Sequence, residues 1–231
     1  ENAKLEAMND ASLSASVTGN SLSINAQNVN LSGQYQLAGN VQISAENRLT
    51  TDDAEINTAD LALSATDLTF SQTDIRAVNS QLTAKKDLTF SGSVVGTSLS
   101  VQASNNASLI GNYALSDVLS VAAGNELKVN GIVAEAVNLM LAGDRVSADS
   151  AVLESDQTVL TATNDLILSG SIVGNDLIIN AANADISGQY GLSNSLSVAT
   201  TNQLTADNMI AVTDQLKLDG QILVLTNADI T

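Results

Sequence analysis

The chain has 231 residues, of which 44 % are hydrophobic but only 2 % aromatic, and its net charge is −17. It contains no proline, cysteine or histidine, which excludes disulfides, thiolate metal sites and the usual nucleophile–histidine pairs. The excess of acidic residues opposes binding to nucleic acids and to anionic membrane surfaces. The longest apolar run, residues 222–225, is far shorter than the roughly 18 residues of a membrane-spanning helix.

Residues 1–11 show little pattern, but from Ser12 onward a short theme returns every 19 or 20 residues. Each copy closes on a polar residue, and this regular spacing is typical of stacked repeats rather than of a globular domain. The closing residues are Asn28, Asn47, Asp67, Asp87, Asn106, Asn125, Asp144, Asn164, Asn183 and Asn202.

Within each copy, apolar residues alternate with polar ones, as in residues 99–103 (LSVQA). A period of two predicts a β-strand with one buried face, whereas a helix needs spacings of three and four. Each copy is expected to contain two or three short strands joined by Gly/Asn corners. In the copy that closes at Asn183, we expect strands at 166–168, 171–173 and 177–179.

The sequence therefore predicts an all-β fold, a right-handed parallel β-helix with rungs of about 19–20 residues. Crossovers between parallel strands are overwhelmingly right-handed, and a left-handed hexapeptide coil needs a strict 18-residue turn. The absence of proline agrees with strands whose N–H groups all pair. We expect residues 1–231 to form one continuous segment, cut from a longer repeat protein.

A longer period lies over the short one. The tripeptide Gly-Gln/Asn-Tyr recurs at intervals of 78 and 77 residues, which predicts a duplicated block of four rungs. The blocks lie approximately at 11–86, 87–164 and 165–231.

Two columns of residues are candidate functional positions. The closing asparagines are expected either to stack as a ladder of side-chain amides or to act only as turn formers. Asp67, Asp87 and Asp144 are expected to interrupt such a ladder, with side chains that face water because stacked like charges repel. The asparagines are Asn28, Asn47, Asn106, Asn125, Asn164, Asn183 and Asn202.

The second column consists of Tyr35, Tyr113 and Tyr190, which end the recurring tripeptides. One interpretation is a periodic surface anchor for a ligand. The other is that each ring caps local packing at a corner and leaves its hydroxyl in water.

Carboxylates are the only abundant catalytic side chains left. The two densest groups are Asp52 with Asp53 and Glu55, and Asp149 with Glu154 and Asp156. Neither group repeats at one position over neighbouring rungs, and aromatic platforms for sugars are nearly absent. We therefore expect no catalytic site, no metal and no cofactor.

Residues 87–94 (DLTFSGSV) and 165–177 (DLILSGSIVGNDL) resemble the haemagglutinin repeats of filamentous haemagglutinin-like exoproteins. These are the large secreted partners of two-partner secretion systems, and they include contact-dependent growth-inhibition proteins. The family pattern covers nearly all of residues 12–231. The chain departs from it in having only 14 glycines and no amino-terminal secretion motif.

The resemblance implies a secreted or cell-surface shaft outside a Gram-negative outer membrane, and an outer-membrane secretion partner. It transfers no catalytic residue. The leading hypothesis is a non-catalytic shaft or adhesin segment that presents a distal binding or toxin region. The alternatives are a module that binds a host or bacterial receptor or a polysaccharide on one face, and a β-helical polysaccharide lyase or hydrolase.

Overall fold

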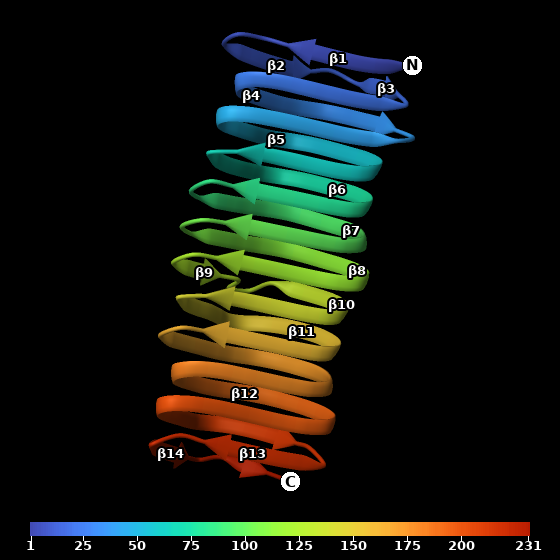
Figure 1. Ribbon diagram of the computed structural model, residues 1–231. Coiled ribbons are helices and arrows are strands. Elements are labelled where there is room, and N and C mark those ends of the chain that lie inside the picture. The colour runs from blue at the N-terminus through green and yellow to red at the C-terminus, as the bar shows by residue number, and fades with distance from the viewer.

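The computed structural model describes residues 1–231 and contains 15 β-strands and no helix. The chain coils into a parallel β-solenoid of about 12 turns, each of roughly 19 residues, with the two termini at opposite ends of the stack (Figure 1). The predicted all-β solenoid and its period are thus confirmed, whereas the right-handed sense and the block boundaries stay predictions. No segment forms a helix of the length and apolarity that a membrane span requires.

The strands differ greatly in length because backbone pairing often continues through the corners of a turn. The longest strand, β12, has 48 residues and so covers more than two turns. The bounds are β1 Asn2–Glu6, β2 Asp10–Ser14, β3 Val17–Gly19, β4 Ser21–Leu37, β5 Asn40–Ala65, β6 Asp67–Ala84, β7 Leu88–Ala103, β8 Ala107–Ala123, β9 Glu126–Lys128, β10 Val133–Gly143, β11 Arg145–Ala162, β12 Asp165–Val212, β13 Gln215–Asp219, β14 Ile222–Thr226 and β15 Asp229–Ile230.

Every strand pair is parallel, and each turn pairs with the turns before and after it. Leu99, for example, lies opposite Ser80 on one side and Leu119 on the other. Of 186 backbone hydrogen bonds, 160 lie within this strand network. A proline would remove one of these donors, which explains why the chain tolerates none.

The interior is a narrow stack of apolar layers. A single cluster of 64 buried residues runs through the solenoid, composed mostly of leucine, isoleucine, valine and alanine. The five aromatic rings also lie inside, and Phe70, Phe90 and Tyr113 form a continuous run with centroid separations of 5.1 and 5.8 Å. Each turn adds one thin layer to this interior, and aliphatic side chains fill most of it, so few aromatic residues are needed.

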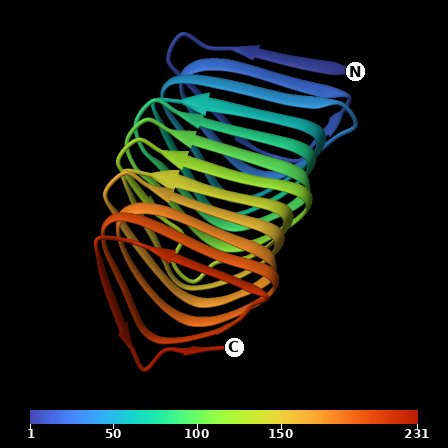
Figure 2. The same cartoon turned by 60° about the horizontal axis from the view of Figure 1, so that its bottom comes forward.

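Each turn has three straight segments separated by corners, and the turns enclose a common interior (Figure 2). In β7 the three segments are 88–91, 93–96 and 98–103, and buried and outward residues alternate along each of them. The outward residues of these segments and of their equivalents in other turns are called the first, second and third face. Gly92 forms the first corner with φ 147°, and a Cβ there would lie 2.0 Å from the carbonyl oxygen of Thr73.

Candidate functional site

The tyrosine column lies inside the solenoid. Tyr35, Tyr113 and Tyr190 are only 1–2 % exposed, and Tyr35 belongs to the same inward column as Ile56 and Ile75. The surface-anchor interpretation is therefore wrong, and the packing interpretation is right about the rings but wrong in leaving the hydroxyls in water. The inward period of two continues from Leu31 through Gly33 to Tyr35, so the Tyr35 ring points into the interior.

The three tyrosine hydroxyls have different surroundings. The Tyr35 hydroxyl lies 2.9 Å from the carbonyl oxygen of Leu13 and 3.0 Å from that of Ser32, and the Tyr190 hydroxyl donates to the carbonyl of Ser187. The buried Tyr113 hydroxyl has no partner. Burial raises the pKa of all three phenols above the usual value, although the bond to Ser32 partly opposes this rise at Tyr35.

The closing asparagines form short ladders at the corner between the third and first faces. Asn106 donates through Nδ2 to Asp87 Oδ1 at 2.9 Å, and Asn125 donates in the same way to Asn106 Oδ1 at 3.0 Å. Three further asparagines donate to an aspartate one turn earlier: Asn28 to Asp10 at 2.7 Å, Asn164 to Asp144 at 2.7 Å and Asn183 to Asp165 at 2.9 Å.

The aspartates therefore take part in the ladders. Asp87 and Asp144 each accept a hydrogen bond from the next turn, so the prediction that their side chains only face water is wrong, whereas the predicted interruption of the column does occur before each of them. A carboxylate can accept but not donate, so an aspartate begins a ladder and cannot extend it backward. No such side-chain bond forms at Asp67.

Two asparagines of the predicted column stay outside the ladders. Asn47 lies one residue out of register, since the residue opposite Asn28 is Arg48. Asn202 is exposed, and neither amide forms a side-chain hydrogen bond. A spacing of 19 or 20 residues was too coarse to separate two adjacent corner positions.

Similar bonds occur at other positions of the turn, where the sequence analysis expected none. Asn79 donates to Asp60 at 2.8 Å, and Ser93 donates to Asp74 at 2.5 Å. In the sequence, these pairs can be found as an aspartate that is followed 19 residues later by asparagine or serine.

The first carboxylate group does not converge on one point. Glu55 forms an ion pair with Arg76 at 2.5 Å, while Asp53 occupies a corner with φ 49°. The second group is also divided, with Asp149 on the first face and Glu154 on the second. No three carboxylates in the structure are arranged so that they could hold a metal ion.

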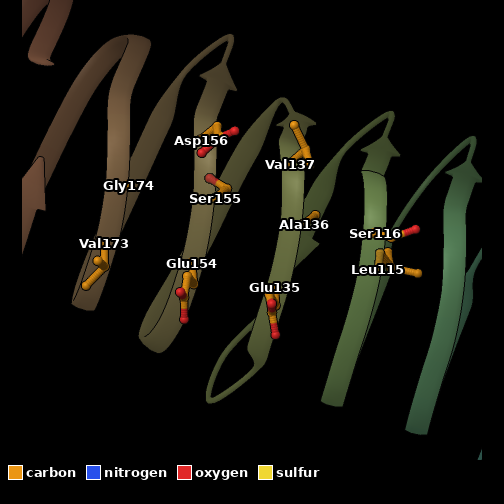
Figure 3. A pocket seen from close by; sticks show the side chains of 10 residues that line it. All are labelled: Leu115, Ser116, Glu135, Ala136, Val137, Glu154, Ser155, Asp156, Val173 and Gly174. Carbon is orange, nitrogen blue, oxygen red and sulfur yellow. The ribbon is translucent and has the colours of Figure 1, made fainter. Parts of the chain in front are cut away.

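An open groove of about 270 Å³ crosses four turns at the corner between the second and third faces. The first of these four turns has a longer corner, with one residue more between Ala114 and Val118 than the equivalent corner of either neighbouring turn. This longer corner contributes Leu115 and Ser116 to the groove. Its lining side chains are drawn in Figure 3 and are Leu115, Ser116, Glu135, Ala136, Val137, Glu154, Ser155, Asp156, Val173 and Gly174.

Two exposed valines, Val137 and Val173, line this groove, and three more lie on the second face. Each is between 41 and 52 % exposed, and Val133 lies directly opposite Val152 on the neighbouring turn. Together with the outward Ala114, they form an apolar area on the second face and its corner, which we call the valine face. Its valines are Val95, Val133, Val137, Val152 and Val173.

Two carboxylates lie within the valine face. Glu135 is paired directly with Glu154, and Figure 3 shows the two side chains on neighbouring strands. Ion pairs in the chain occur only at Lys4–Glu6, Arg76–Glu55 and Lys128–Glu126, so no basic residue neutralises this pair. Like charges directly opposite one another destabilise a sheet.

Comparison of the chain with protein-family models, curated proteins and solved structures gives no match in any of the three.

Proposed function

We propose that the chain is a non-catalytic structural segment of a large bacterial exoprotein, a shaft that holds a distal binding or toxin region away from the cell. The observation that supports this function best is the uninterrupted stack of about 12 similar turns. In such a solenoid each turn contacts only its neighbours, and length is gained by adding turns. Stiffness then comes from the repeated backbone ladder.

The sequence pattern supports a more specific assignment. The lines beginning at Asp87 and Asp165 resemble the haemagglutinin repeats of filamentous haemagglutinin-like proteins. On this proposal the chain is exported through an outer-membrane partner and lies at the surface of a Gram-negative bacterium or in its surroundings. The region that it presents is an adhesin or a growth-inhibition toxin.

A deletion in the full-length protein tests the shaft. Removing residues 87–164 joins Lys86 to Asp165, which holds the position equivalent to Asp87, so the turns on both sides keep their phase. Four turns are lost, and the stalk is expected to shorten by about 19 Å. Electron microscopy of labelled cells measures the distance from the membrane to the distal region.

The shaft proposal predicts a shorter stalk that is still displayed and whose distal region keeps its binding or toxic activity. Loss of that activity in a stalk that is displayed and shortened as expected would overturn the proposal, because the segment would then act directly on a ligand. Residues 87–164 hold no ion pair except Lys128–Glu126, so few other contacts are disturbed.

The valine face favours a second function for the same segment, that of a binding module. Exposed apolar side chains that cluster among polar ones often mark an interaction site, and the valine face holds five exposed valines. A shaft and a binding module are compatible, since a stiff rod can present a site on its side.

A further inference from the structure

We propose that the valine face and the adjoining groove bind an extended polypeptide segment that carries both apolar and basic side chains. The proposal does not depend on the function proposed above, because a lateral site is possible whatever the solenoid presents at its end. Three observations support it: the outward valines, the paired glutamates without a cation, and a groove that connects them.

The solenoid itself does not require valine at these positions. Val133 and Val152 occupy the outward column that holds Glu55 and Asp74 three turns or more earlier. Those earlier residues are charged, and the fold accommodates them equally well. In this column, therefore, the two valines replace charged residues and are not required by the backbone.

The neighbouring column also differs between the earlier and the later turns, but there the change is in charge. Glu135 and Glu154 occupy the column of Asn57 and Arg76. In the earlier turns Arg76 neutralises Glu55 on the same face. In the later turns two glutamates are stacked with no basic partner, which destabilises the free protein and favours binding of a cation.

The shape of the groove indicates a polypeptide rather than a single ion. It crosses four turns, a span of about 14 Å, which is the length of about four extended residues. Its walls combine apolar side chains, such as Val137 and Val173, with the carboxylates of Glu135, Glu154 and Asp156. Alternating apolar and basic side chains match this lining.

Charge excludes two other occupants. The chain has a net charge of −17, and a second copy brought to this face would set carboxylates against carboxylates. A nucleic acid would be repelled in the same way. A basic partner is the one that both the local glutamate pair and the whole molecule attract.

The test uses a fluorescent synthetic peptide of alternating lysine and valine, titrated with the 231-residue chain. We expect saturable binding that weakens as salt is added. In the matched variant, four residues of the later turns are replaced by the residues that occupy the same columns in the earlier turns, so the backbone register is kept. The substitutions are Val133→Glu, Glu135→Asn, Val152→Asp and Glu154→Arg.

The matched variant is expected to bind the peptide at least about tenfold more weakly. Circular dichroism of the variant confirms that the β-structure is retained.

Three results would overturn the proposal. They are unchanged affinity in the matched variant, equal binding of a peptide that alternates glutamate and valine, and the absence of saturable binding by the native chain. A variant that loses its β-structure is replaced by the double change Glu135→Gln and Glu154→Gln. That change keeps the side-chain volume, and we still expect it to weaken binding and to reduce the salt dependence.

Discussion

Side-chain hydrogen bonds from asparagine or serine to an aspartate of a neighbouring turn run in one direction along the solenoid. Wherever asparagine or serine donates to an aspartate on another turn, the donor belongs to the later turn, as in Asn106 to Asp87 and Ser93 to Asp74. The backbone N–H of Asn106 also donates to Asp87 Oδ1, at 3.1 Å. The carboxylate therefore points toward the following turn and fixes its corner.

The first prediction concerns Asn106, which donates to Asp87 and accepts from Asn125. We expect Asn106→Ala to lower the free energy of unfolding by about 1 kcal/mol or more, because the half-buried side chain loses three hydrogen bonds, including one from the backbone N–H of Glu126. Asn47→Ala is the control and is expected to be nearly neutral. Urea denaturation followed by circular dichroism compares the two, and equal effects would contradict the assigned ladder.

The second prediction uses the different surroundings of the tyrosine hydroxyls. Tyr113→Phe removes a buried hydroxyl that has no partner, so its stability is expected to be unchanged or higher. Tyr35→Phe removes the bonds to Leu13 and Ser32 and is expected to lose about 1 kcal/mol. Thermal melting of the two variants measures the difference, and the reverse order would be inconsistent with the structure.

The third prediction concerns high pH. Burial raises the pKa of Tyr35, Tyr113 and Tyr190, while in the unfolded chain each phenol titrates near its usual value of about 10. The stability that this difference supplies is complete below pH of about 10 and is lost as the pH rises toward the folded values. Tyrosinate absorbance is therefore expected to rise together with loss of the β-sheet signal. Ionisation of all three tyrosines with the β-sheet signal intact would show that the rings are not buried.

Within the strands, side chains that point inward are mostly apolar, whereas side chains that point outward can be polar or charged. Leu177 and Ile178 are neighbours in β12, yet Leu177 is fully buried in an inward column and Ile178 points outward opposite Val159. Both residues pair with the preceding turn through the backbone, so they differ only in the environment of their side chains. The same alternation allowed the strands to be predicted from sequence.

The fourth prediction compares these two neighbours. Leu177→Asp is expected to destabilise the chain by about 3 kcal/mol or more, because it places an unpaired charge in the apolar interior. Ile178→Asp carries the same charge outward and is expected to have an effect below about 1 kcal/mol. Thermal melting of the two variants checks the register, and an equal loss of stability would show that it is misassigned.

At the scale of the molecule, the sequence predicted the solenoid but not its surface. The apolar period of two and the turn of 19 or 20 residues were enough to predict the stack. The ladders at Asp87 and Asp144 were misjudged because charge repulsion was considered without the neighbouring amide donors. The valine face was not predicted, because Val133 and Val152 become neighbours only once the length of every corner is known.

The most direct test of the account is disulfide formation between engineered cysteines, for which the cysteine-free chain gives a clean background. Ser100 and Ser120 lie opposite each other on adjacent turns, about 4.8 Å apart, a separation that a disulfide spans. Ser100 and Met140 lie two turns apart in the same column, about 10 Å, which is too far. The account predicts that the pair Ser100→Cys and Ser120→Cys oxidises within the chain, whereas Ser100→Cys with Met140→Cys does not. Equal oxidation of the two pairs, or oxidation of the second alone, would contradict the stacked register.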